Sequence, residues 1–197
     1  MVSSDKQETR SRILRAVWTL MEGNRGQGAR MSDIAKAAGI SRQALYLHFD
    51  NRADLLVATT RYMDEVQGVE DLLRPSREAT TGAERLREFV SAMGAHFPNV
   101  QGMARALLAI KDTDKEAQAA WNERMGAIRE GCAAAIEMLA DEGELPEVWS
   151  VETATALFWS MLSFETWDQL TTRSGWDHAQ YTKEMQALAM RSFVKSC

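Results

Sequence analysis

Apolar residues recur along much of this chain at the spacing of one helix face, and polar residues fill the positions between them. Over residues 5–21 the apolar positions follow an i, i+1, i+4, i+7, i+8 pattern, with arginines on the opposite face. The stretch GNRGQGAR that follows ends this helix, because glycine is a poor helix former. The pattern then predicts two short helices, over residues 32–38 and 42–49, joined by the turn AGIS.

Longer amphipathic segments account for the rest of the chain. Few helix breakers interrupt them, since the chain has only 3 prolines, and no long alternating run of Val and Ile predicts a strand. We therefore expect an all-α fold. The segments predict, in order, a helix over 54–73 that ends before Pro75, one over TTGAERLREFVSAMGAHF broken by Pro98, a shorter one over NVQGMARALLAI, a long one over 114–139, and two final helices over 151–172 and 177–194.

The size of the chain, 197 residues with 45% hydrophobic content, is enough for one sizeable domain or for a small module plus a larger one. The stretch MVSSDKQETRSR has no apolar segment that could serve as a signal peptide, and no segment approaches the roughly 18 apolar residues of a membrane span. Two cysteines, Cys132 and Cys197, do not make a disulfide framework. We therefore expect a cytoplasmic protein, with Cys132 as a buried, inert thiol rather than a redox sensor.

Charge is distributed unevenly along the chain. Residues up to Leu56 contain nine Lys and Arg against six Asp and Glu, a net charge of +3, although the whole chain has a net charge of −5. The remainder therefore carries −8. A mildly basic first part on an acidic second part indicates two functions in one chain.

The segment AGISRQALYLHFDNR contains the side chains best suited to chemistry. Gly39 can adopt the left-handed conformation that ends one short helix, and the Ser41 hydroxyl can cap the next. Arg42 and Gln43 would then lie in the first turn of a helix whose N-terminus attracts phosphate. Arginine and glutamine also form bidentate hydrogen bonds to guanine and adenine in the major groove, as the second helix of a helix-turn-helix does. The alternative is a pair of short core helices whose charges are simply solvated.

Residues 9–56 resemble the DNA-binding domain of the TetR family of bacterial one-component transcriptional regulators. The resemblance implies three N-terminal helices, a connecting fourth helix, and a larger helical domain that binds a small molecule and dimerises. We accordingly expect a helix-turn-helix DNA-binding domain over 1–52 and a helical ligand-binding and dimerisation domain over 53–197. The matching elements are Arg10 with Ile13-Leu14, Asp33-Ile34-Ala35, Ala38-Gly39-Ile40-Ser41, Leu45-Tyr46, His48-Phe49, and Asn51-Arg52 with Leu55-Leu56.

The family resemblance also implies which residues contact DNA. Arg42 and Gln43 would face base edges, with Ala44 against a thymine methyl, and the tyrosine and histidine that follow would contact the backbone. Arg52 matches a phosphate-binding position at the start of the fourth helix. Arg30 stands where family members usually have a Thr or Ser cap. The complete set of expected DNA-binding residues is Arg10, Arg30, Arg42, Gln43, Ala44, Tyr46, Leu47, His48 and Arg52.

The second part of the chain is rich in large, adaptable apolar side chains. Residues 57–197 contain five of the 6 tryptophans and eight of the 11 methionines. Such residues usually form plain core, but the resemblance implies a ligand cavity in this part, and methionine adapts to varied ligands. Glu165 and Asp168 could meet a cationic ligand, or could lie on a solvated face. The candidate lining residues are Met93, Phe97, Met103, Leu107, Trp121, Met125, Trp159, Phe164 and Trp167.

Together these features predict a sequence-specific DNA-binding repressor that releases a palindromic operator when a small apolar or amphipathic ligand binds. We expect a homodimer, because one short helix buries too little surface for specific binding, whereas two helices can read a palindrome. The apolar faces of the last two helices could form its interface or could be buried within one protomer. They contain Phe158, Met161 and Leu162, and then Met185, Leu188, Ala189 and Phe193.

Two other classes of function compete with this prediction. An enzyme is disfavoured because the three histidines are scattered and no GxxxxGK[ST], GxSxG or metal-ligand spacing occurs. We therefore expect no catalytic activity, no cofactor, no metal and no membrane association. A helical module that binds protein instead of DNA is the second alternative. Salt separates the two, because DNA binding weakens steeply as salt is added.

Overall fold

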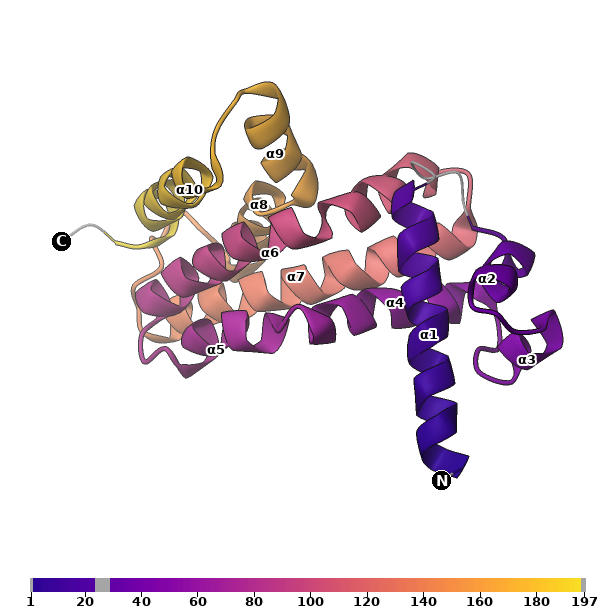
Figure 1. The fold of residues 1–197 in the computed structure, drawn as a ribbon. Helices are drawn as coiled ribbons and strands as arrows, with labels where there is room; N and C mark the ends of the chain where they lie inside the picture. The colour runs from indigo at the N-terminus through magenta and orange to yellow at the C-terminus, as the bar shows by residue number, and fades with distance from the viewer. Residues whose placement is uncertain (1, 24–28, 196–197) are drawn as a thin grey trace. The chain divides into compact units, whose positions relative to one another are not determined.

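The computed structural model describes residues 2–23 and 29–195, and within these ranges the secondary structure is helical without a strand. The expected all-α fold is confirmed, with a helix-turn-helix followed by a larger helical part (Figure 1). Residues 24–28 of the predicted glycine-rich loop, and Cys197, lie outside the described residues. The elements are α1 (Val2–Gly23), α2 (Met31–Ala37), α3 (Arg42–Tyr46), α4 (Arg52–Val66), α5 (Val69–Glu78), α6 (Gly82–Ile110), α7 (Lys115–Asp141), α8 (Val151–Met161), α9 (Phe164–Asp168), the π-helical turn η1 (Gln169–Arg173) and α10 (His178–Phe193).

The chain folds into two compact units. The first unit consists of the residues up to Gln67 together with Val100–Arg124, and the second of Gly68–Asn99 together with the residues from Met125 onward. Both α6 and α7 therefore contribute residues to each unit. The division of functions at residue 52 stays a prediction. No helix of the described part is long and apolar enough to cross a membrane.

The first unit is built around α1, which packs against α2 and α4, while α2 packs against α3 (Figure 1). These contacts exclude water from the apolar faces that the periodicity predicts. Burying each such side chain stabilises the fold by roughly 1.5–3 kcal/mol. The fully buried side chains of this core include Ile13, Val17, Ile34, Leu45 and Leu55.

The turn between α2 and α3 has the predicted construction. Gly39 has a φ of 66°, the left-handed conformation that side chains with a Cβ disfavour. Next to it, the Ile40 N–H donates to the Ala35 carbonyl across the end of α2. The Ala44 N–H donates to Ser41 Oγ at 3.0 Å, so the predicted cap is confirmed. The second short helix is shorter than expected, because α3 ends at Tyr46 and a turn follows.

The predicted single helix over 54–73 is wrong. Its place is taken by α4 and α5, which are separated at Gly68, where a φ of 65° breaks the helical backbone. Pro75 lies inside α5 and does not end it. The predicted break at Pro98 is also wrong, because α6 continues through it from Gly82 to Ile110. A proline inside a helix costs about 3 kcal/mol, and the buried side chains on either side of it, including Phe97 and Met103, outweigh that cost.

The later helices agree with the sequence in part. The long helix over 114–139 is confirmed as α7, and the last helix as α10. The predicted helix over 151–172 is wrong as a single element, because α8 ends at Met161 and Ser163 caps a new helix. The Thr166 N–H donates to Ser163 Oγ at 3.1 Å, so a local side-chain acceptor starts α9 where periodicity alone predicts continuation.

The second unit has an aromatic core. Phe97, Phe164 and Trp167 are in mutual contact, with ring centroids 5.4–6.1 Å apart. Phe158 contacts Phe193 at 5.6 Å, and α8 packs against α10. Where the two long helices enter this unit they run antiparallel, since Gly82 packs against Leu139 and Gly131 against the Phe89 ring. Burial raises the pKa of the Cys132 thiol, which is fully buried as expected and therefore unreactive.

Most of the apolar residues proposed for a dimer interface are buried within this unit. Phe158, Leu162, Ala189 and Phe193 have no exposed surface, and Met185 has almost none. They are therefore core residues of one protomer and cannot form the interface. Of the other two proposed residues, Met161 is half-buried and Leu188 is 40% exposed; on α8, Leu157 is a further large apolar side chain that is 40% exposed.

Candidate nucleic-acid interface

Helix α3 has one buried face and one exposed face. Leu45 and Phe49 anchor it in the core, whereas Arg42, Gln43 and Tyr46 are exposed. Leu47, which directly follows α3, is 76% exposed and adds apolar surface next to these side chains. The exposed residues combine two hydrogen-bonding side chains with apolar surface, which suits base edges and thymine methyl groups.

Arg42 contacts a residue of its own helix. Its Nη2 lies 3.4 Å from the Tyr46 hydroxyl, and its Cζ lies 5.7 Å from the centre of the Tyr46 ring. These contacts, one helical turn apart, orient the guanidinium without taking up its remaining N–H donors. Ala44 is half-buried behind these side chains, and its N–H is used by the Ser41 cap.

Arg10 fastens α1 to the end of α3. Its Nη1 donates to the His48 carbonyl at 3.0 Å, and its guanidinium lies 4.3 Å above the Phe49 ring. The imidazole of His48 is half-buried, and burial, with Lys6 and Arg10 nearby, lowers its pKa. His48 is therefore neutral at pH 7, where it can donate a hydrogen bond to phosphate but brings no charge. The expected DNA-binding role of Arg10 stays a prediction.

An open cavity of about 850 Å³ lies within the first unit beside α3. Arg30 is exposed there and makes no side-chain cap for α2, as expected for an arginine where the family has Thr or Ser. Basic side chains come from four separate segments of the chain, and two carboxylates lie among them. The cavity is lined by Ala29, Arg30, Met31, Ser32, Arg42, Arg52, Ile110, Thr113, Asp114, Lys115 and Glu116.

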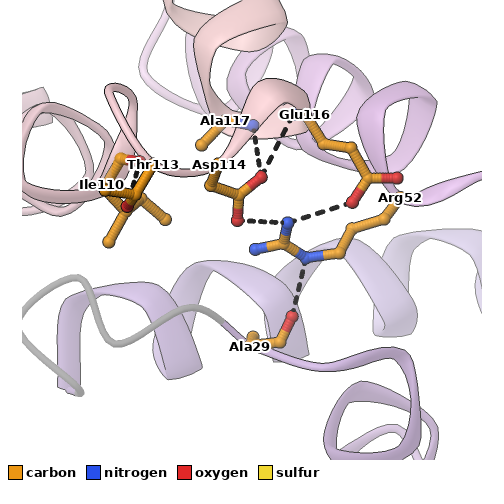
Figure 2. A network of polar contacts seen from close by, with 7 residues as sticks. All are labelled: Ala29, Arg52, Ile110, Thr113, Asp114, Glu116 and Ala117. Atoms are coloured by element: carbon orange, nitrogen blue, oxygen red, sulfur yellow. Dashed lines mark hydrogen bonds and ion pairs between the residues drawn. The ribbon is translucent and has the colours of Figure 1, made fainter.

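Arg52, the expected phosphate contact, lies at the centre of a polar network (Figure 2). Its Nε donates to the Ala29 carbonyl at 2.9 Å, and its Nη1 donates to Asp114 Oδ2 at 2.7 Å and Glu116 Oε2 at 3.1 Å. The Arg52 side chain is only 12% exposed. The structure thus places this guanidinium against protein carboxylates, and its phosphate-binding role stays a prediction.

Asp114 joins this network to the start of α7. Its Oδ1 accepts hydrogen bonds from the Glu116 and Ala117 N–H groups at 3.1 Å each, which caps the helix. Burial would raise the pKa of Asp114, but the hydrogen bonds from Ala117 and Arg52 hold it below its ordinary value. Asp114 is therefore ionised at neutral pH. Nothing in the local sequence links residues 114 and 116 to Arg52, more than sixty positions away, so sequence reasoning missed both.

The candidate ligand-lining residues do not gather in one place. Met103, Leu107 and Trp121 belong to the first unit and are buried there. The other six belong to the second unit. Three of them, Phe97, Phe164 and Trp167, form the aromatic cluster described above. Of the remaining three, Met93 is buried, and Met125 and Trp159 are half-buried.

The acidic residues proposed for a cationic ligand are more exposed than the aromatic cluster. Glu165 is exposed and Asp168 is half-buried. Within the part of the chain that the structure describes, no three His, Cys, Asp or Glu side chains are placed to hold a metal ion.

Comparison with known proteins agrees with this geometry. Residues 23–59 match the family model for bacterial regulatory proteins of the tetR family. No curated protein sequence matches the chain. Among solved structures, NalD of Pseudomonas aeruginosa, the secondary repressor of the MexAB-OprM multidrug efflux pump, superposes with a TM-score of 0.70 at 19% identity, covering 98% of each chain.

Two further structures show the same fold. FadR of Bacillus subtilis, in complex with stearoyl-CoA, has a TM-score of 0.69 at 19% identity, covering 92% of this chain and 97% of its own. A protein of Saccharomonospora viridis described as a transcriptional regulator, in complex with choline, has a TM-score of 0.72 at 16% identity, covering 96% and 100%. Residues 23–59 thus match the DNA-binding part of the tetR family of bacterial regulatory proteins, and the chain as a whole shares the fold of these solved regulators.

Proposed function

We propose that this protein is a sequence-specific DNA-binding transcriptional regulator whose helix α3 reads bases in the major groove. The observation that carries the proposal is the first turn of α3, where Ser41 caps the helix and leaves Arg42 and Gln43 exposed. Leu45 and Phe49 hold the opposite face in the core, so the exposed side chains are presented from a fixed helix. Such preorganisation reduces the entropy lost on binding.

The protein acts as a twofold dimer on a palindromic operator. A five-residue helix contacts only a few base pairs, and a dimer doubles that contact with half-sites about 34–36 Å apart or a multiple of that spacing. Leu157 and Leu188 supply exposed apolar surface on α8 and α10, two helices that pack together in the second unit. We therefore keep Leu188 from the predicted interface, add Leu157, and leave out the buried residues.

A small apolar or amphipathic ligand binds the second unit and releases the operator. Its aromatic cluster and its methionines support this assignment, and fold relatives bind ligands as different as stearoyl-CoA and choline. Ligand and operator then oppose each other by linkage, with a coupling of about 1–3 kcal/mol. Since α4 ends at Val66 in the first unit, the helices suited to carry the signal are α6 and α7, which contribute to both units.

The test is selection of bound fragments from a random or genomic DNA pool by the purified full chain. We expect enrichment of a palindrome, and affinity that falls steeply as salt is added. The variant Arg129→Ala, an exposed arginine of α7 in the second unit, serves as a control that keeps the enriched sequence. Failure to enrich any sequence, or binding that salt does not weaken, would overturn the proposal and favour a protein-binding helical module.

A further inference from the structure

Arg52 has the position of a phosphate contact but the partners of a structural ion pair. Building on the function proposed above, we propose that Asp114 and Glu116 compete with a DNA phosphate for the Arg52 guanidinium. The two carboxylates thereby set the affinity of the protein for DNA. In the conformation described here the carboxylates hold Arg52, and the start of α4 offers no free positive charge to the operator (Figure 2).

The charge balance of the network favours this competition. One guanidinium faces two carboxylates, so the cluster has a net charge of −1 at neutral pH, which repels phosphate. Nη1 of Arg52 donates to both Asp114 at 2.7 Å and Glu116 at 3.1 Å, and Nε donates to Ala29, so a phosphate held by two parallel hydrogen bonds would need Nη1 or Nε in addition to Nη2. A bidentate phosphate contact to Arg52 therefore has to displace one of these protein acceptors.

The surrounding cavity gives a phosphate group somewhere to bind. Arg30, Arg42 and Lys115 line it, and all three are exposed. When the carboxylates withdraw, Arg52 would join these cations and add one phosphate contact. With the carboxylates in place, their charge offsets part of the attraction that the other three cations exert.

The position of the carboxylates depends on α7. Asp114 caps this helix through Oδ1 while binding Arg52 through Oδ2, so the N-terminus of α7 and the ion pair move together. The same helix contributes Ile128 and Cys132 to the buried core of the second unit. A ligand that holds α7 in the conformation described here would therefore keep Arg52 paired and DNA affinity low.

The experiment measures operator affinity against salt for the double variant D114N/E116Q of the full chain. Asparagine keeps the oxygen that caps α7 and glutamine keeps the shape of Glu116, so the variant loses the two charges and the Asp114 oxygen that accepts from Arg52. We expect affinity at low salt to rise several-fold. We also expect the slope of log K against log salt to steepen by about one, the signature of one added phosphate contact.

Two matched variants separate this effect from a general change in charge. Glu123 pairs with Arg61 at 2.8 Å between the same two helices, α7 and α4, so E123Q removes a comparable charge without touching Arg52. We expect E123Q to leave the salt slope unchanged. In a protein that also carries R52Q, the substitutions D114N/E116Q should leave the slope unchanged as well.

Several results would overturn the inference. These are weaker operator binding by D114N/E116Q, an unchanged slope, an equal gain from E123Q, or the same gain when Arg52 is absent. Circular dichroism confirms that each variant folds, and the single variant D114N replaces the double one if it does not. If the wild-type protein binds no DNA at any salt concentration, the proposed function itself is refuted. If the wild-type protein binds DNA and the double variant has the same salt slope, only the inference about Arg52 is refuted.

Discussion

Helices α3 and α4 begin in the same way, and their first arginines have different surroundings. Each starts with a polar cap, Ser41 or Asn51, whose side chain accepts a backbone N–H at 3.0 or 2.9 Å. Each then has an arginine, at 42 and 52, and a fully buried leucine three residues later. Yet Arg42 is exposed and contacts Tyr46 of its own helix, whereas the Arg52 side chain is 12% exposed and forms ion pairs with residues at the start of α7.

The difference shows which properties are local and which depend on the whole fold. A cap and a buried leucine are set by neighbours in sequence, so both helices form in the same way. The partner of an arginine is set by whichever segment the tertiary structure brings close. Consequently Arg42 stays exposed, as the proposed base reading requires, whereas Arg52 is held by protein carboxylates.

Replacing the buried leucines should have the largest effect on stability, and the effect should be similar in both helices. Leu45→Ala and Leu55→Ala each remove a fully buried side chain, so each should lower the free energy of unfolding by about 2–5 kcal/mol. Urea denaturation measures this. Leu47→Ala, at a position 76% exposed, is the control and should change stability by less than about 0.5 kcal/mol. A small loss at only one of the two leucines would mean that the two helices are anchored differently.

Removing the two arginines should change the free energy of unfolding by different amounts. Arg52→Ala leaves Asp114 and Glu116 facing each other, and because both are partly exposed we expect a loss of about 1–2 kcal/mol in the free energy of unfolding. Arg42→Ala should cost less than about 0.5 kcal/mol. The same denaturation experiment measures both. Equal losses would contradict the distinction drawn between the two arginines.

Removing either cap should lower the stability of the protein by a similar amount. Ser41→Ala and Asn51→Ala each leave one backbone N–H without its acceptor, which should cost about 1 kcal/mol. Replacement by glycine should cost only a few tenths of that amount. Thermal unfolding followed by circular dichroism compares the four variants. If alanine at either position proved harmless, the cap there would not hold its helix.

The smallest effect concerns His48, between the two helices. Its pKa is lowered by burial and by Lys6 and Arg10, so below about pH 6.5 the unfolded chain takes up a proton that the folded protein resists. The free energy of unfolding should therefore fall as the pH drops from 7 to 5, and by less in His48→Gln. Denaturation at several pH values measures the difference in the free energy of unfolding between the wild type and His48→Gln. The other histidines are present in both proteins, so their contributions cancel. A difference that is constant with pH would refute the neutral histidine.

These comparisons also show how far the sequence predicts the molecule. The Ser41 cap, the left-handed Gly39 and the exposed first turn of α3 follow from residues close together in the chain, and the sequence predicted them. The break at Gly68 and the uninterrupted helix through Pro98 depend on packing that outweighs local preference, so periodicity predicted both wrongly. The partners of Arg52 lie more than sixty residues away, and no local pattern indicates such a contact.

The most direct test of a base-reading α3 is the ratio of operator affinity to random-DNA affinity, measured for Arg42→Ala and Arg52→Ala under the same salt conditions. Arg42→Ala should weaken operator binding by about 1–3 kcal/mol, leave random DNA much less affected, and so lower the ratio. Arg52→Ala should leave the ratio unchanged, because any contact that it makes is to phosphate. If Arg42→Ala lost the same amount of binding free energy on the operator and on random DNA, base reading by α3 would be contradicted.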